Sequence, residues 1–138
     1  MKPTLKRLIN NDPTLTTLNT RYNHIGATGA KTIADTLIVN STITTLHISG
    51  NNIGDTGAIT IADSLIVNST LTTLYLSGNN IGETGAKSIA DSLIVNTTLT
   101  DLHLGLKHQE KVNWITTRNK SNKHNKESSL VDLLYNYL

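Results

Sequence analysis

Two histidines, a tyrosine and an aspartate are the residues of this sequence best suited to chemistry. His47, Tyr75 and His103 follow one another at intervals of 28 residues. Asp101 lies two residues before His103, and an Asp–His pair could act as a general base. No Ser, Cys or Lys is evidently paired with it as a nucleophile, however. If the two histidines lie on strands two apart, about 10 Å separates them, which is too far for one zinc ion. We therefore predict neither catalysis nor metal binding here.

Recurring acidic residues and glycines are the other candidates for chemistry. Asp35, Asp63 and Asp91 recur at the same spacing and could form a cation-binding stripe. Helices pack about 10 Å apart, so two such carboxylates cannot share an ion, and a solvated face is the simpler interpretation. Glycine pairs such as Gly54 and Gly57 lack the Lys-Ser/Thr of a phosphate-binding loop. The sequence predicts no cofactor and no enzyme activity.

A repeat of 28 residues organises most of the chain and must position these side chains. Three complete copies follow one another: 15–42, 43–70 and 71–98. The second and third agree at 21 of 28 positions, and the first and second agree at 19. A fourth copy stops after 99–105, and 1–14 keeps the phase of an earlier helical half. We predict one domain over 1–105.

Each copy carries two hydrophobic periods. Leu74 and Leu76 alternate with polar residues, as expected of a short strand. Apolar residues then recur at helical spacing: Ala86, Ile89, Ala90 and Leu93. One such unit buries its apolar face only by stacking on its neighbours. The sequence therefore predicts a right-handed α/β solenoid, with parallel strands on the concave face and helices on the convex face.

The repeat resembles a known family. Its strand half follows the leucine-rich repeat pattern L-x-x-L-x-L-x-x-N-x-L, which Ile43, Leu46, Ile48, Asn51 and Ile53 match. The period and the I-G-[DE]-x-G-A stretch resemble the ribonuclease-inhibitor-like subclass. That subclass also occurs in nucleotide-binding leucine-rich-repeat receptors and in Ran GTPase-activating proteins. The resemblance implies a horseshoe fragment that binds proteins.

The resemblance covers residues 1–105 and has two departures. Thr20 replaces an apolar strand residue in the first complete unit, and Lys107 stands where a fourth unit should have Asn. Relatives of this kind include enzyme inhibitors, sensing arms of receptors and GTPase activators. Regulation or inhibition of an enzyme or small GTPase is therefore an alternative function, although no residue matches a GTPase-activating site.

Two sets of asparagines recur with the repeat. Asn23, Asn51 and Asn79 follow the strands, where backbone groups lose their sheet partners. An amide side chain has the donors and acceptor to satisfy these groups, so we predict a buried ladder rather than surface turns. A second set falls where each helix must end: Asn40, Asn68 and Asn96. We predict the left-handed conformation there, because Asn tolerates it.

The concave face is the predicted binding surface. Between near-identical units, the strand position occupied by Asn, His, Tyr and His varies most, whereas scaffold positions stay fixed. We take this as a sign of specificity rather than of neutral drift. The predicted partner-binding residues are Asn19, Arg21, Thr45, His47, Thr73, Tyr75, Asp101 and His103. We predict non-catalytic binding of a partner protein or peptide.

The composition changes after the repeats. Residues 1–105 contain six basic and seven acidic residues, whereas 106–127 contain six basic and two acidic ones. We predict a basic, flexible tail over 106–127. An alternative function is that residues 107–126 contact nucleic acid or an anionic membrane, although the charge density is modest and a solvated linker is favoured. The pattern of apolar residues in 128–138 predicts a short amphipathic helix. We expect this helix either to cover the last strand or to bind another chain.

Composition also bounds the location and assembly of the protein. The sequence has no Cys, which excludes disulfides and thiolate metal sites, and no apolar run reaches the length of a membrane span. No signal peptide is evident, so we expect a cytoplasmic protein, or one exported to a host cell if the source is an intracellular parasite. Exposed solenoid ends make self-association possible.

Overall fold

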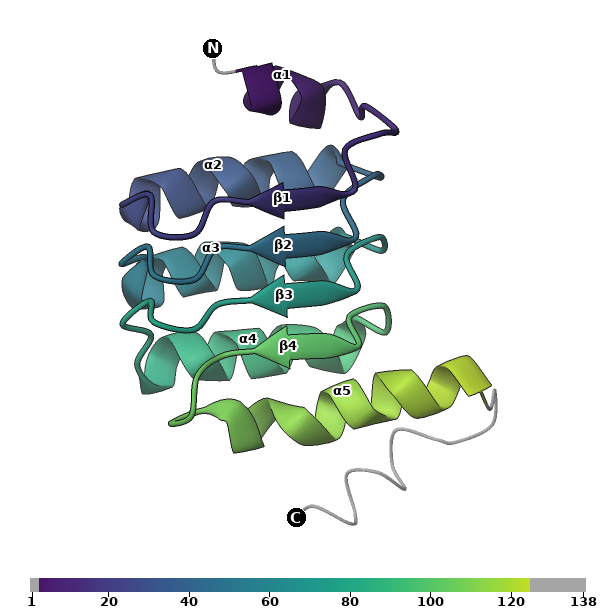
Figure 1. Ribbon diagram of the computed structural model, residues 1–138. Helices are drawn as coiled ribbons and strands as arrows, with labels where there is room; N and C mark the ends of the chain where they lie inside the picture. Colours follow the sequence, from purple (N-terminus) through teal and green to yellow (C-terminus); the bar gives the residue numbers. More distant parts are fainter. Residues whose placement is uncertain (1–2, 125–138) are drawn as a thin grey trace.

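The computed structural model describes residues 3–124, which form helices and strands in strict alternation (Figure 1). The elements in chain order are α1 (Pro3–Ile9), β1 (Thr17–Asn19), α2 (Gly26–Val39), β2 (Thr45–His47), α3 (Gly54–Val67), β3 (Thr73–Tyr75), α4 (Glu83–Val95), β4 (Asp101–His103) and α5 (Gln109–His124). The strands form one layer and α2, α3 and α4 form a second layer behind it. The predicted α/β solenoid is confirmed.

The sheet is parallel and keeps the phase of the repeat. Its order is β1-β2-β3-β4, and each residue pairs with the one 28 positions later, as Leu46 does with Leu74. Parallel strands need a crossover between them, and α2, α3 and α4 supply it. Equivalent side chains therefore stand next to one another across the whole sheet.

The core is a thin aliphatic layer between the sheet and the helices. Each strand turns its central leucine inward, and Leu46 and Leu74 are fully buried. The helices α2, α3 and α4 bury the same small and large residues against the sheet, such as Ala58 and Leu65 in α3. The other side of the sheet points away from the helices and is the concave face of the predicted solenoid.

The asparagines at the helix ends differ from our prediction. Asn40, Asn68 and Asn96 have φ of −78°, −72° and −71° with extended ψ, not the left-handed conformation. Their side-chain amides instead form hydrogen bonds with the neighbouring repeat. The Asn96 Nδ2 group donates to the carbonyls of Leu65 (2.8 Å) and Asn68 (3.0 Å), and its Oδ1 accepts from the Leu99 N–H (2.8 Å). All three side chains are buried, so the helix ends form a second asparagine ladder.

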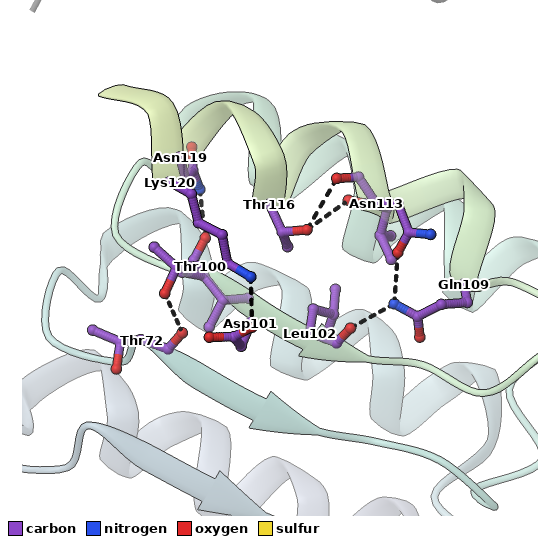
Figure 2. Close-up of polar contacts among 11 residues, drawn as sticks. Thr72, Thr100, Asp101, Leu102, Gln109, Asn113, Thr116, Asn119 and Lys120 are labelled. Carbon is purple, nitrogen blue, oxygen red and sulfur yellow. Dashed lines mark hydrogen bonds and ion pairs between the residues drawn. The ribbon is translucent and has the colours of Figure 1, made fainter. Parts of the chain in front are cut away.

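The prediction of a flexible tail over 106–127 is wrong for Gln109–His124, which form α5. This helix packs on α4 and β4 and covers the last repeat (Figure 1). Polar composition misled the prediction, because polar side chains here are buried and hydrogen-bonded to the last repeat. The Gln109 Nε2 group donates to the Leu102 carbonyl (2.6 Å), and Asn119 Nδ2 donates to the Leu99 carbonyl (2.6 Å), as Figure 2 displays for Gln109. The predicted helix over 128–138 lies outside the described residues.

Arg118 is a further residue that joins α5 to the repeats, and it is fully buried. Its Nη2 group donates to the carbonyls of Leu93 (2.6 Å) and Asn96 (3.0 Å). Asn96 bonds the equivalent two carbonyls 28 residues earlier in the chain. The Arg118 guanidinium therefore occupies the place that the next asparagine of the helix-end ladder would have. Burial lowers the pKa of Arg118. The guanidinium lies at the C-terminal end of α4, where the helix dipole favours positive charge.

Candidate functional site

A continuous stack of three rings runs across the concave face. The ring centroids of His47 and Tyr75 are 4.3 Å apart and their planes differ by 9°. Those of Tyr75 and His103 are 4.4 Å apart, with planes at 6°. The sheet register sets this arrangement, because neighbouring strands lie about 4.8 Å apart and carry these rings at the same position. The result is a rigid aromatic strip with polar tips.

The other predicted binding residues surround this strip. Asn19 continues it on β1, where its Oδ1 accepts a hydrogen bond from the Arg21 backbone N–H (3.2 Å). Thr45 and Thr73 are half-buried neighbours of the rings on the same strands. The sheet thus brings together the predicted residues of β1, β2, β3 and β4, and Arg21 lies two residues after the end of β1.

The two charged residues predicted for this face differ in their surroundings. Asp101 is neutralised by Lys120 of α5, with the Nζ group 2.8 Å from Oδ1 (Figure 2). Arg21 is exposed and forms no ion pair within residues 3–124. The concave face therefore presents the positive charge of Arg21 at its β1 end, while its acidic residue is already paired.

A hollow of about 410 Å³ lies beside the rings and adds residues that the sequence analysis did not select. Its polar lining consists of Arg21, Tyr22, Ser49, Tyr75, Ser77 and His103. These side chains carry hydroxyl, guanidinium and imidazole groups and include no carboxylate. The hollow is therefore suited to an anionic or hydrogen-bond-accepting group.

Tyr22 closes one side of this hollow and could have been found from the repeat. It occupies the position where the next two units have Gly50 and Gly78. The missing side chain of Gly50 makes room for it, since a Cβ there would lie 2.3 Å from Cδ1 and Cε1 of Tyr22. A large residue at a repeat position that is otherwise glycine was the signal in the sequence, and the sequence analysis missed it.

The imidazole of His47 differs from that of a free histidine in two ways. Burial lowers its pKa, and the positive charge of Arg21 lowers it further. Its Nδ1 atom is buried and has no hydrogen-bond partner in the described part of the chain. The ring therefore favours the neutral form and leaves one polar atom unsatisfied.

The asparagines after the strands hold the loops beside this face. The Asn79 Oδ1 atom accepts from the backbone N–H of Asn51 (2.8 Å), and its Nδ2 donates to the carbonyls of Ile48 (2.9 Å) and Leu76 (2.8 Å). Asn51 accepts in the same way from the backbone N–H of Asn23 (2.8 Å). Asn51 and Asn79 are buried. The predicted burial is wrong for Asn23, which is exposed and donates only locally, to the Arg21 carbonyl (2.7 Å), so it ends the series.

The basic residues after the repeats are largely engaged. Lys111 pairs with Glu83, Lys120 pairs with Asp101, and Arg118 is buried. Lys107 is exposed. Most of the positive charge described in this region is therefore bound to the protein itself rather than presented to a ligand.

Residues 3–124 show neither a metal centre nor a membrane-spanning helix. No group of three or more His, Cys, Asp or Glu side chains in this part of the chain is arranged to hold a metal ion. Among the described helices, none combines the length and apolar character of a membrane span.

Comparison with known proteins identifies a family that this chain matches and solved structures that it resembles. The family described as Leucine Rich repeat matches residues 11–34, 39–62 and 67–90. The solved structure of the Leiomodin-1 Actin-Binding Site 2 is similar at 25% identity, with a TM-score of 0.71 over 88% of this chain and 90% of that one. The tropomodulin C-terminal domain of Caenorhabditis elegans shares the fold at 12% identity, with a TM-score of 0.55 over 87% of this chain and 93% of that one. No curated protein matches the sequence.

Proposed function

Because this chain belongs to the leucine-rich repeat family, we propose that it is a non-catalytic module that binds a segment of a partner protein on its concave face. Repeat solenoids generally use such extended surfaces for protein binding. The observation that carries the proposal is the stacked strip of His47, Tyr75 and His103. Rigid rings supply contact area at a low entropic cost, and aromatic residues dominate binding energy at interfaces.

The chemistry beside the strip indicates what the partner segment carries. Arg21 has no ion pair among the described residues, and the adjoining hollow offers hydroxyl and imidazole groups without a carboxylate. A carboxylate of the partner would accept hydrogen bonds from Arg21 and the Ser49 hydroxyl, and such bonds are stronger when one partner is charged. The favoured ligand is therefore a segment with an acidic residue next to an apolar or aromatic one.

Actin is a specific candidate for the partner. The similarity to the Leiomodin-1 Actin-Binding Site 2 extends over 90% of that chain, at 25% identity. Sedimentation of the full chain with filamentous actin, and native electrophoresis with monomeric actin, test this candidate. A bound fraction that the His47→Ala/Tyr75→Ala variant loses would support it. Equal binding by both proteins, or by neither, would exclude actin as the concave-face ligand.

Two broader functions remain as alternatives. The 28-residue repeat with a full helix supports the ribonuclease-inhibitor-like subclass, in which regulators or inhibitors of enzymes and small GTPases occur. Such a role would use the same concave face. Contact of residues 107–126 with nucleic acid or a membrane is less favoured, because Lys111, Arg118 and Lys120 are engaged within the protein. We also propose a cytoplasmic location, because no signal peptide is evident in the sequence. Imaging of the tagged chain tests this location.

Site-specific photo-crosslinking tests the binding surface even while the identity of the partner is open. A photoreactive residue is placed at Ser77 on the concave face, or at Lys87 on α4 as a matched control. Both positions lie on the third complete repeat. Discrete crosslinks from Ser77 that disappear in the His47→Ala/Tyr75→Ala background would support the proposal. Crosslinks that form equally from Lys87, or that survive in that background, would contradict it.

A further inference from the structure

The helix layer carries an exposed apolar surface that the concave face does not explain. Each of α2, α3 and α4 ends in an Ile-Val pair, and these side chains are 42–65% exposed. We call this set the Ile–Val row: Ile38, Val39, Ile66, Val67, Ile94 and Val95. Single exposed aliphatic residues are ordinary, but six in three adjacent helices form a patch of the kind that marks an interaction site.

Acidic residues border the row. Asp35, Asp63 and Asp91 lie three and four residues before its members, and therefore on the neighbouring turn of the same helix surface. Asp35 and Asp91 pair with lysines at i−4. Asp63 has Ile59 at that position and forms no ion pair within residues 3–124. The acidic border favours an occupant that carries both apolar and basic residues. It disfavours an occupant with an anionic surface.

Helix α5 passes the end of this row that lies on α4. Arg118 donates to the carbonyls of Leu93, Ile94 and Asn96, so α5 crosses the C-terminal end of α4, where the row ends. Figure 1 shows the end of α5 on the same side as the ends of α2, α3 and α4. The same helix already covers β4, as Figure 2 shows. Residues 128–138 are therefore not needed to cover the last strand.

The sequence beyond α5 has the composition that the row requires. Lys126 precedes a segment with one apolar stripe at helical spacing: Leu130, Leu133, Leu134, Tyr137 and Leu138. An isolated helix of this length is marginal in water, so it needs a surface to bind.

The reach of this segment selects the near part of the row. Residues 125–127 span at most about 10 Å, and a helix over 128–138 is about 16 Å long. Helices pack about 10 Å apart, so α4 and α3 are within reach while the far side of α2 is not. We propose that residues 128–138 form a helix that docks intramolecularly on Ile66, Val67, Ile94 and Val95, with Lys126 facing the acidic border.

Engineered cysteine pairs test this docking, because the natural sequence has no cysteine that would interfere. The full chain with Val67→Cys and Leu133→Cys is oxidised at micromolar concentration. The matched control pairs Leu133→Cys with Ser49→Cys on the concave face. A tethered pair has an effective concentration near millimolar, so the docked pair should close at least about 100-fold faster than a bimolecular reaction. We expect a monomeric crosslinked product from the first pair and none from the control.

Three results would overturn the proposal: a disulfide-linked dimer, equal crosslinking of both pairs, or no crosslink in either. The dimer would assign the row to a second copy of the chain.

A second measurement tests the docking without introduced cysteines. In the full chain, Leu133→Asn with Leu134→Asn should raise the fluorescence of a hydrophobic dye severalfold by uncovering the row, whereas Ser128→Asn with Ser129→Asn should not. No rise on the leucine substitutions would also contradict the docking.

Discussion

At the scale of single residues, the asparagines decide how the loops are held. Asn51 satisfies backbone groups of its own loop and of the preceding repeat, donating to the carbonyls of Ile48 (2.8 Å) and Thr20 (2.9 Å). Its side chain is fully buried, so these groups have no water to replace it. This amide therefore holds the loop beside the concave face together with Asn79, which also bonds the Ile48 carbonyl.

Replacing Asn51 with Ala should lower the free energy of unfolding by about 1–3 kcal/mol, because buried polar groups lose their partners. Urea denaturation monitored by circular dichroism measures this. Asn23→Ala is the matched control, since Asn23 occupies the equivalent position but is exposed; its cost should be below about 1 kcal/mol. Equal costs for the two substitutions would show that burial of the ladder is not what stabilises the loops.

His47 gives the fold a pH dependence of known sign. Its pKa in the folded state is lowered from the usual value near 6.5, mainly by burial and further by Arg21. The unfolded state therefore binds a proton more readily, so the contribution of His47 to stability is lost as the pH falls below about 6.5. Urea denaturation between pH 7.5 and pH 5 should show this loss, and His47→Gln should reduce it. An identical pH profile in His47→Gln would contradict the assignment.

At the scale of elements, the repeat made most of the fold predictable. Strand and helix positions follow from the alternation of Leu74 and Leu76 and from the helical spacing of Ala86 and Leu93, because every copy buries the same residues. Conformation at the helix ends was not predictable from local preference. There, inter-repeat hydrogen bonds of residues such as Asn96 outweigh the tolerance of Asn for left-handed backbone.

The last helix was missed for a physical reason. Its mean composition is polar, and its buried positions include Thr116, Arg118 and Asn119 beside the apolar Val112. A search for apolar periodicity cannot recognise a helix that docks by donating to carbonyls of the preceding repeat. The hollow beside the concave face was missed for a different reason. It depends on Tyr22 standing over Gly50, and the comparison of the units considered the strand positions rather than this glycine position.

Arg118→Ala should destabilise the protein by about 2–3 kcal/mol, because it removes charged hydrogen bonds to two buried carbonyls. Chemical denaturation measures the change. Lys120→Ala is the matched control two residues away in α5; its ion pair with Asp101 is exposed, so its loss should cost less than about 1 kcal/mol. If both variants were equally stable, α5 would not be anchored through Arg118.

At the scale of the whole molecule, the two proposed binding surfaces lie on opposite layers. The concave face presents the rings and the positive charge of Arg21. The Ile–Val row lies on the helix layer and is proposed to hold the chain's own C-terminal segment. Substitutions in one surface should therefore leave the other unaffected.

Charge complementarity at the concave face is tested with Arg21→Gln. Affinity for a partner with an acidic segment should fall, and the dependence of that affinity on salt should weaken, since an exposed ion pair is screened by ions. Lys107→Gln is the control, because Lys107 is exposed but lies outside the lining of the hollow. Titration calorimetry at two ionic strengths provides the measurement. A larger effect of Lys107→Gln would move the binding site away from Arg21.

The most direct test of concave-face binding is the affinity of the crosslinked partner for the wild-type chain and for His47→Ala/Tyr75→Ala. Both residues are partly exposed on the sheet, so the variant should keep the circular dichroism spectrum of the repeats. Removal of two central aromatic anchors, each contributing about 2 kcal/mol, predicts at least about 100-fold weaker binding by titration calorimetry. An affinity within about threefold of the wild type, with the fold intact, would contradict the account.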